Sequence, residues 1–393
     1  MNDPIVIVSA ARTPMGAFQG ELKQFAASEL GAAAIRAAVE RAKIKPEQVD
    51  EVIMGCVLPA GQGQAPARQA SLGAGLPLAT GCTTINKMCG SGMKAAMLAH
   101  DLLAAGTNDV MVAGGMESMT NAPYLLAKAR GGYRLGHGQL IDHMFYDGLE
   151  DAYEKGRLMG SFAEDCAAKY SFTREQQDKF AVASLERAQA ANKNGSFAWE
   201  ITPMNLKAGK DERFMERYES PFKANFEKIP TLKPAFKKDG TITAANSSSI
   251  SDGGAALVMM RRSTAEKLGL APLAIVAGHS THAQEPGWFT TAPVGAIKKL
   301  YDKTGWSAGT VDLYEINEAF AVVTMAAMKE HGLPHEKVNI HGGACALGHP
   351  IGASGARILV TLIGALRKTR GKRGIASLCI GGGEATAMAL ELV

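Results

Sequence analysis

The chain alternates between short apolar runs and longer segments whose apolar residues recur every three or four positions. The short runs predict strands at 5–9, 51–57, 109–114, 273–277, 312–316 and 375–380. The longer segments predict helices at 27–42, 92–105, 294–303, 318–330 and 354–368. Strands that alternate with helices indicate parallel or mixed sheets covered by helices. The sequence therefore predicts an α/β fold.

The two ends of the chain carry the same succession of segments. Residues 33–50 align without a gap with residues 295–312, and a small-residue helix start, GSGMKAA at 90–96, matches ASGARIL at 353–359. Few residues are identical, but the matches follow one another in the same order, which indicates an ancestral duplication. Two equivalent halves could pack their helices against each other in a layered α/β architecture.

A segment of different character separates the two halves. It contains few β-like runs, many charges and six of the eight tyrosines. One clear helix, 173–194, starts with a Thr173 cap and ends before Gly195. We expect an insertion that covers a site, with a structural excursion of no catalytic duty as the alternative. The predicted parts are residues 1–118, completed by about 249–270, the insertion 119–248 and the second half 271–393.

Composition excludes several classes of function. Hydrophobic residues make up 46% and charged residues 20%, as in soluble globular proteins. The net charge of +4 is small and no basic run carries interleaved aromatic residues, so nucleic acid is not expected as a partner. No apolar stretch is long enough for a membrane span, and the N-terminus lacks the features of a signal peptide. Six scattered cysteines match neither a secreted disulfide framework nor a zinc-ligand spacing. We therefore expect a cytoplasmic protein without a metal site or a membrane partner.

The segment NKMCGSGMKAA, residues 86–96, places Cys89 just before a helix with a small, flexible first turn. The free N–H groups at a helix start favour a thiolate. Their contribution is about 0.3–1 kcal/mol, and up to about 2 in good geometry. Lowering a thiol pKa by two units needs roughly 2.7 kcal/mol. A nucleophilic Cys89 therefore requires a neighbouring base, and a small buried hydrophobic residue is the alternative.

The segment HGGACALGHPIGASGAR, residues 341–357, offers such a base. His349 lies between Gly348 and Pro350, ahead of the helix start that matches the one after Cys89. Two equivalent loops can converge at a pseudo-twofold axis and bring the cysteine and the histidine together. An activated sulfur nucleophile needs that pairing. A histidine with only a structural role is the alternative.

Two further segments place polar groups at strand ends. In SLCIGGGEA, residues 377–385, Cys379 ends a strand and is followed by glycines whose backbone N–H groups can stabilise an oxyanion. In NEAF, residues 317–320, Asn317 could orient a water or polarise a carbonyl. The alternatives are a buried strand residue for Cys379 and a helix cap for Asn317.

Together these segments resemble the signatures of the thiolase family. The likeness includes NKMCGSG at Cys89, NEAF and GGACALGHPIGASG around His349, and CIGGGEA at Cys379, and it continues through SAARTP, AGGMESMT and NSSSISDGGAA. The resemblance implies a duplicated, layered α-β-α-β-α fold of the thiolase type with an inserted loop domain. It also implies an acyltransferase that handles acetyl-CoA, 3-ketoacyl-CoA and CoA, needs no separate cofactor, and assembles as a homotetramer, a dimer of dimers.

The family pattern implies a role for each matching residue. Cys89 would carry the acyl group, His349 would activate it, and Cys379 would remove or return the proton at the α-carbon of the second thioester. His349 and, through a water, Asn317 would form one oxyanion hole. The backbone N–H groups of Cys89 and Gly381 would form the other. Loss of one such donor typically costs about 10²–10³ in rate.

The substrate pocket is expected to include Ser248, which matches a serine near the pantetheine arm of coenzyme A, and Phe320, which matches the usual aromatic residue. Met159 follows a leucine where many short-chain members have a histidine. The segment GWFTTAP places Trp288 and Phe289 near the acyl pocket, where a small loop is common. These departures leave the length of the acyl chain open.

The favoured activity is the reversible Claisen condensation of two acetyl-CoA to acetoacetyl-CoA and CoA, or thiolysis of a short-chain 3-ketoacyl-CoA. A degradative thiolase of broader chain length is the main alternative. A decarboxylating ketoacyl synthase would combine one cysteine with two histidines, or with a histidine and an asparagine, so Cys379 argues against it. A non-enzymatic acyl-CoA-binding protein would not need every catalytic group that the chain contains.

Overall fold

The computed structural model describes residues 3–208 and 211–393. The first half contains β1 (Ile5–Arg12), β2 (Gly16–Ala17), α1 (Ala27–Ala42), β3 (Glu51–Gly55), α2 (Pro66–Gly73), β4 (Gly81–Ile85), α3 (Ser91–Ala104), β5 (Val110–Ser118), β10 (Ser251–Arg261) and α7 (Arg262–Lys267). The second half contains β11 (Ala274–Ala283), α8 (Ala292–Thr304), β12 (Leu313–Ile316), α9 (Ala321–His331), α10 (Ala344–Leu347), α11 (Ser354–Thr369), β13 (Arg373–Ile380) and β14 (Glu384–Leu392). Within the described ranges, no helix is long and apolar enough to span a bilayer.

The strand order and the strand directions repeat between the halves. β3 is parallel to β5, which is followed by antiparallel β10 and β1. β12 is parallel to β13, which is followed by antiparallel β14 and β11. Parallel β4 also has a counterpart, because Val338 forms a parallel bridge to Tyr314 in β12. β1 and β11 join the two half-sheets over two residue pairs. The repeat agrees with the predicted duplication.

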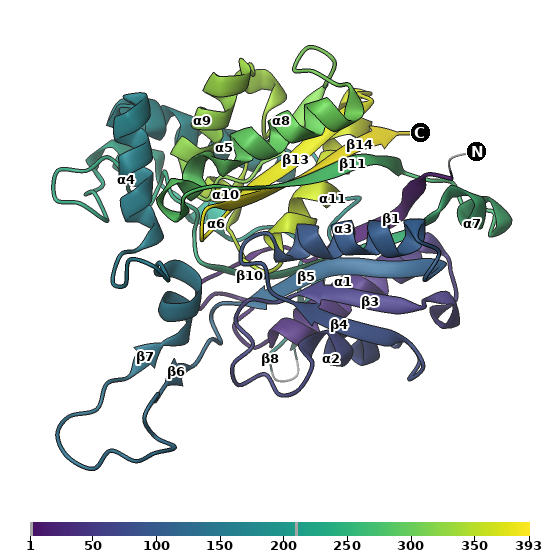
Figure 1. Ribbon diagram of the computed structural model, residues 1–393, viewed down its shortest axis with the longest axis horizontal. Coiled ribbons are helices and arrows are strands. Elements are labelled where there is room, and N and C mark those ends of the chain that lie inside the picture. Colours follow the sequence, from purple (N-terminus) through teal and green to yellow (C-terminus); the bar gives the residue numbers. More distant parts are fainter. Residues whose placement is uncertain (1–2, 209–210) are drawn as a thin grey trace.

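Helices separate and cover the half-sheets in five layers. α3 and α11 contact each other and strands of both halves, so they form the central layer. α1 and α2 cover the outer face of the first half, and α8 covers the outer face of the second beside α9 (Figure 1). α11 is buried over all of its residues from 354 to 366, as expected of a helix enclosed on every side. The predicted layered α-β-α-β-α fold is confirmed.

Two glycines at matching repeat positions allow the central helices to meet. A Cβ on Gly92 would lie 2.8 Å from the backbone nitrogen of Ala356, and a Cβ on Gly355 would lie 2.3 Å from that of Met93. Real Cβ atoms do not approach backbone this closely. The first turns of α3 and α11 are therefore in backbone contact, which draws together the loops that precede them.

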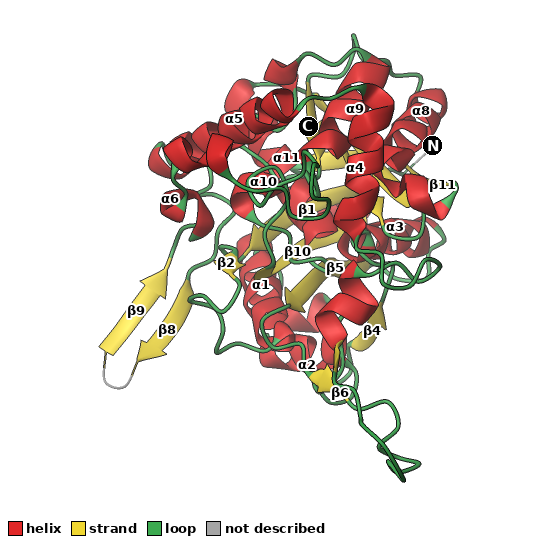
Figure 2. Cartoon of the chain, turned by 90° about the vertical axis from the view of Figure 1, so that its left-hand side faces the viewer, coloured by secondary structure: helices red, strands yellow, loops and turns green. Residues whose placement is uncertain are grey.

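The chain leaves the first half-sheet after β5 and returns to it at β10. The excursion contains β6 (Tyr124–Leu125), β7 (Ile141–Asp142), α4 (Met159–Tyr170), α5 (Arg174–Lys193), β8 (Met204–Ala208), β9 (Asp211–Met215) and α6 (Ser220–Lys223). Thr173 caps α5 by accepting from the N–H of Gln176, as predicted. The arm around β6 and β7 and the β8–β9 hairpin project from the body (Figure 2). The predicted domain boundaries at 118, 248 and 270 stay predictions.

Candidate active site

A cavity of about 380 Å³ lies where the excursion meets both halves of the fold. Its reactive groups come from loops far apart in sequence: Cys89 precedes α3, His349 precedes α11, and Cys379 lies at the end of β13. Apart from Asn317 and Trp288, the predicted site residues line this cavity, namely Cys89, Met159, Ser248, Phe289, Phe320, His349, Cys379 and Gly381. The fold therefore gathers most of the predicted site around one space.

Cys89 is held on a tight turn ahead of α3. Met88 adopts the left-handed conformation, with φ +45°, which is uncommon for a residue with a side chain. The Ser91 hydroxyl donates to the backbone oxygen of Met88 at 2.6 Å and so closes the turn. A Cβ on Gly90 would lie 2.3 Å from Cδ1 of Ile380, so Ile380 would have to shift to admit a side chain there. The turn thus brings Cys89 against the end of β13.

The surroundings of Cys89 favour the neutral thiol. Burial raises its pKa to about 11, while hydrogen bonds from the backbone N–H groups of Gly381 and of Cys89 itself lower it, and the charge of Glu117 raises it slightly further. The helix start alone does not produce a thiolate, which agrees with the requirement for a base. The same two N–H groups are those predicted to form an oxyanion hole.

His349 is buried beside the cavity with a contact on each ring nitrogen. Its Nδ1 lies 2.6 Å from Oγ of Ser354, and its Nε2 lies 3.5 Å from Nδ2 of Asn317. Its backbone N–H donates to the carbonyl of Ser249 at 3.0 Å. Burial lowers the pKa of His349 to about 3, and the charge of Arg357 lowers it as well. The imidazole is therefore neutral near pH 7 and can accept a proton.

Asn317 follows β12 and is buried behind the cavity wall. Its Oδ1 contacts no hydrogen-bond donor among the described residues. It does not cap α9, which begins at Ala321 with Phe320 in the cap position and no side-chain cap. The helix-cap alternative for Asn317 is therefore wrong. Its amide instead faces the imidazole of His349, as a group that acts through a water or on the histidine would.

Cys379 is buried at the end of β13. Burial raises its pKa well above that of an ordinary thiol, and negative charge on Cys89 raises it further. Cys379 is therefore a protonated thiol in the resting site. Because the charge on Cys89 contributes to this pKa, the two thiols lie close enough to influence each other.

Aromatic and sulfur side chains form the apolar wall of the cavity. Phe236 meets Phe320 edge to face with ring centres 6.1 Å apart, and Phe289 meets Phe162 at the same distance. Trp288 is not part of the lining, and its ring lies 4.3 Å from the ammonium group of Lys169. The expectation that Trp288 borders the acyl pocket is therefore wrong.

Ser248 belongs to a strip of residues, 247–250, that forms another wall. Its backbone N–H donates to the carbonyl of Ala319 at 2.9 Å, and the next residue accepts from the backbone of His349. The strip thus joins the loop after β12 to the loop before α11. This connection places Ser248 between the two loops that carry Asn317 and His349.

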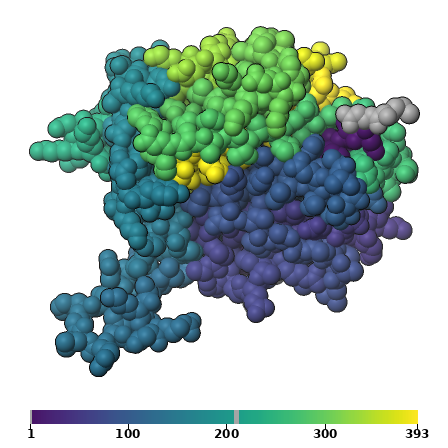
Figure 3. All heavy atoms as spheres, viewed as in Figure 1, coloured from purple at the N-terminus to yellow at the C-terminus, as the bar shows by residue number. Residues whose placement is uncertain are grey.

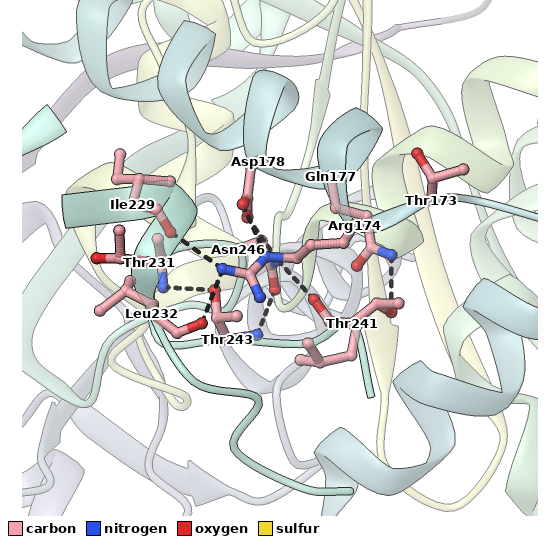
Figure 4. A network of polar contacts seen from close by, with 12 residues as sticks. Thr173, Arg174, Gln177, Asp178, Ile229, Thr231, Leu232, Thr241, Thr243 and Asn246 are labelled. Atoms are coloured by element: carbon pink, nitrogen blue, oxygen red, sulfur yellow. Dashed lines mark hydrogen bonds and ion pairs between the residues drawn. The ribbon is translucent and has the colours of Figure 1, made fainter. Parts of the chain in front are cut away.

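A polar network fixes the chain just before this strip (Figure 4). Asn246 donates from Nδ2 to Asp178 of α5 at 3.1 Å and accepts from the backbone N–H of Thr243 at 2.8 Å. Arg174, one helical turn before Asp178, pairs with it at 2.7 Å and donates to the carbonyls of Ile229 and Leu232. The excursion therefore holds one wall of the cavity in place through buried and half-buried hydrogen bonds.

Sequence reasoning did not identify three residues that shape the site. Phe236 lines the cavity, and no sequence signal marks it. Glu117 accepts from the backbone N–H groups of residues 57, 58 and 352, and burial raises its pKa to about 7. The sequence signal that could have identified Glu117 is a carboxylate near the end of an apolar strand. For Ser354 the signal was its repeat position, which matches Ser91.

Among the described residues, one group of side chains has donor atoms close enough together for a metal ion. Asp101 lies 3.0 Å from His100 and 2.8 Å from His279, where the end of α3 meets β11. None of the three lines the cavity. The reactive cysteines and His349 therefore do not belong to this group.

Comparison with known proteins gives matches along nearly the whole chain. The family models described as "Thiolase, N-terminal domain" and "Thiolase, C-terminal domain" match residues 5–263 and 270–392. Acetyl-CoA acetyltransferase 2 of Arabidopsis thaliana is 52% identical over 99% of this chain and 97% of its own length. Acetyl-CoA acetyltransferase of Cupriavidus necator is 48% identical over 98% of this chain and 99% of its own. The crystal structure of Acat5 thiolase from Ascaris suum, in complex with coenzyme A, superposes with a TM-score of 0.94 at 40% identity, covering 99% of this chain and 100% of that one.

Proposed function

This chain belongs to the thiolase family, and we propose that it catalyses the reversible condensation of two acetyl-CoA molecules to acetoacetyl-CoA and CoA. The observation that carries the proposal is the meeting of Cys89, His349 and Cys379 in one cavity. The relatives named acetyl-CoA acetyltransferase, aligned over nearly their whole length, support this acyl transfer. The coenzyme A bound in the Ascaris suum thiolase supports CoA as a substrate and product.

In the first half-reaction, Cys89 takes the acetyl group from acetyl-CoA. The neutral His349 accepts the thiol proton of Cys89 while the sulfur attacks the thioester carbon, and the departing CoA thiolate takes the proton of the Cys379 thiol. One thioester breaks as another forms. The negative charge that develops on the carbonyl oxygen requires positioned donors. We assign this task to His349 once it is protonated and to Asn317 through a water.

In the second half-reaction, Cys379, now a thiolate, removes a proton from the α-carbon of another acetyl-CoA. The resulting carbanion attacks the acetyl group on Cys89, so a carbon–carbon bond forms and the Cys89 thiolate leaves. The Cys89 thiolate takes its proton back from His349, and Cys379 keeps the proton from the α-carbon, which restores both resting thiols. Backbone N–H groups of Cys89 and Gly381 are placed to stabilise the oxyanion of this step.

The order of the two steps follows from the mutual influence of the thiols. Negative charge on Cys89 is one cause of the raised pKa of Cys379. The resting Cys89 thiol is neutral, and acetylation converts it into a thioester that cannot become a thiolate. Cys379 can therefore ionise without a negative charge on the neighbouring sulfur once the first acyl group is bound, when a base for the second substrate is needed.

Trapping of the acyl-enzyme tests the proposal. Wild-type protein mixed with acetyl-CoA, quenched in acid and digested, should carry one acetyl group on the peptide that contains Cys89. Cys89→Ser should carry far less, whereas Cys82→Ser, outside the cavity, should label as wild type does. Equal labelling of wild type and Cys89→Ser would contradict the proposal. Release of carbon dioxide from a malonyl thioester during condensation would indicate the ketoacyl-synthase alternative.

We also propose that the protein is a homotetramer, built as a dimer of dimers. Edge strand β4 pairs with β3 on one side only, so a second copy can continue the sheet across a twofold axis. The arm beyond β6 and β7 stands off the body (Figure 3). Its residues 126–140 are all exposed, include Leu135 at 99%, and contain lysine and arginine but no acidic residue. An apolar and basic arm of this kind suits a contact between dimers.

We propose a cytoplasmic location, which the state of the cysteines supports. All six are free thiols, and two of them would have to stay reduced for the chemistry above. A reducing compartment provides that condition. Fractionation of cells of the source organism with an antibody against the protein tests the location, and recovery in an organelle fraction would contradict it.

A further inference from the structure

The imidazole of His349 is enclosed by groups that distinguish its two nitrogens. Nδ1 faces the Ser354 hydroxyl at 2.6 Å, and Nε2 faces the side-chain amide nitrogen of Asn317 at 3.5 Å. His349 and Ser354 are both buried, at 5% and 0% exposure. Neither the role of Ser354 nor the tautomer of the ring follows from the activity alone.

The position of the hydroxyl proton follows from the contacts of Ser354. Its Oγ lies 2.9 Å from the carbonyl oxygen of Pro350, four residues earlier, and a carbonyl can only accept. The hydroxyl therefore donates to Pro350 and offers a lone pair to the histidine. Nδ1 of His349 must then carry the proton and donate to Ser354. The Asn317 amide nitrogen lies 3.5 Å from Nε2, which is longer than an ordinary hydrogen bond, so the lone pair of Nε2 stays available to the cavity.

The duplication gives Ser354 a counterpart with a related task. Ser91 begins α3 as Ser354 begins α11, at matching positions of the aligned segments. The Ser91 hydroxyl accepts from the N–H of Lys87 at 2.8 Å and donates to the carbonyl of Met88. Each serine thus holds the loop before its own helix. Ser91 reaches only backbone, whereas Ser354 reaches the reactive ring.

We propose that Ser354 is a positioning residue that keeps His349 in the tautomer with its proton on Nδ1. Nε2 then presents its lone pair to the cavity, where the proton of Cys89 must go. When the imidazole becomes charged, the hydrogen bond to Ser354 strengthens, which stabilises the imidazolium. This inference rests on the proposed function for its catalytic consequence, but the tautomer itself is a property of the free protein.

Loss of the Ser354 hydroxyl should slow acylation. A hydrogen bond to a charged group contributes about 1.5–3 kcal/mol, so we expect the rate of Cys89 acetylation to fall about 10- to 100-fold in Ser354→Ala. KM for acetyl-CoA should change little, because the serine does not line the cavity. Ser354→Thr, which keeps the hydroxyl, should recover most of the rate. Unchanged acylation in Ser354→Ala would overturn the proposal.

Nitrogen NMR of the histidine-labelled full-length protein tests the tautomer directly. The difference between wild-type and His349→Gln spectra isolates the signals of His349, and we expect a protonated Nδ1 and an unprotonated Nε2. In Ser354→Ala the unprotonated signal should shift towards a mixture of tautomers. Ser91→Ala serves as the matched control and should leave the His349 signals unchanged. A proton on Nε2 in the wild type, or no change in Ser354→Ala, would overturn the assignment.

The two proposals fail in different ways. Absence of an acyl-enzyme in the wild type would remove the proposed function, while the NMR spectra would still decide the role of Ser354. An acyl-enzyme on Cys89 together with an unchanged tautomer in Ser354→Ala would remove the role of Ser354 alone.

Discussion

At the scale of single residues, Cys89 and Cys166 have thiols of similar pKa but different neighbours. Burial raises the pKa of Cys166 to about 11, as it does for Cys89. Yet Cys166 does not line the cavity, whereas Cys89 faces it beside a buried histidine. The thiol that reacts is therefore the one with a base and with space for a thioester.

The two neighbouring aromatics near the acyl pocket differ in the same way. Phe289 lines the cavity and is 3% exposed, whereas Trp288 packs on Lys169 outside it. Phe289→Ala should therefore enlarge the acyl pocket and raise kcat/KM for 3-ketohexanoyl-CoA relative to acetoacetyl-CoA, by about 10-fold for a well-filled pocket. Thiolysis rates across chains of increasing length provide the measurement.

Trp288→Ala is the matched control for this prediction. It removes a larger side chain from the adjacent residue, and it should leave the chain-length profile unchanged. Phe289→Leu should give an intermediate profile. A profile that shifts in Trp288→Ala and not in Phe289→Ala would place the acyl chain elsewhere.

At the scale of elements, the sequence predicted two of the helices well but missed two of the strands. The 27–42 and 354–368 patterns predicted α1 and α11 almost to the residue. β10 and β14 escaped prediction because most of their residues are buried on both faces, so no apolar–polar alternation marks them, and because small residues interrupt their apolar runs. Small residues there serve close packing of helices on the sheet, which local propensity does not register.

The helix contact at Gly92 and Gly355 gives a prediction at this scale. An added methyl group at either position meets backbone of the opposite helix, so the helices must separate. We expect Gly92→Ala and Gly355→Ala to lower the free energy of unfolding by about 1–3 kcal/mol. Because these helix starts hold the Cys89 and His349 loops, acylation should slow as well. Urea unfolding and acetyl labelling measure the two effects.

Gly309→Ala is the comparison for these variants. Its added Cβ meets nothing nearer than the hydroxyl of Ser307 at 3.8 Å, and its backbone conformation is not left-handed. It should unfold and react as the wild type does. If Gly92→Ala and Gly355→Ala unfold and become acetylated as the wild type does, the close contact of α3 and α11 is not required for stability or for the active site.

At the scale of the whole molecule, helices and strands of both halves surround the cavity that holds Cys89, His349 and Cys379. The excursion completes the cavity and carries an arm that no core packing explains. Tyr124–Leu125 pairs with Ile141–Asp142 at the base of the arm, so its ends lie next to each other. The arm can therefore be removed without opening the fold.

Replacing residues 126–140 by Asn-Gly should convert the proposed tetramer into dimers. The two residues can close β6 and β7 as a tight hairpin turn. Light scattering with size-exclusion chromatography should give half the wild-type mass, with acetyl labelling of Cys89 retained. Phe214→Glu, which changes an exposed aromatic on the β8–β9 hairpin, should keep the wild-type mass. A shortened arm with an unchanged tetramer mass would exclude this contact.

The sequence alone determined the duplicated α/β fold and the residues around which the cavity forms. Both depend on local signals: periodicity marks helices and strands, and glycine-rich motifs mark the loops that carry Cys89, His349 and Cys379. Only the tertiary structure decided which neighbours act on those groups. Three findings are of this kind: Trp288 lies outside the cavity, the hydroxyl of Ser354 contacts the imidazole, and the charge of one thiol affects the pKa of the other. Each depends on a contact between segments or turns that no local pattern of the sequence records. Burial and proximity are set when the half-sheets close on α3 and α11, and these two quantities fix the pKa values and the proton positions on which the chemistry depends.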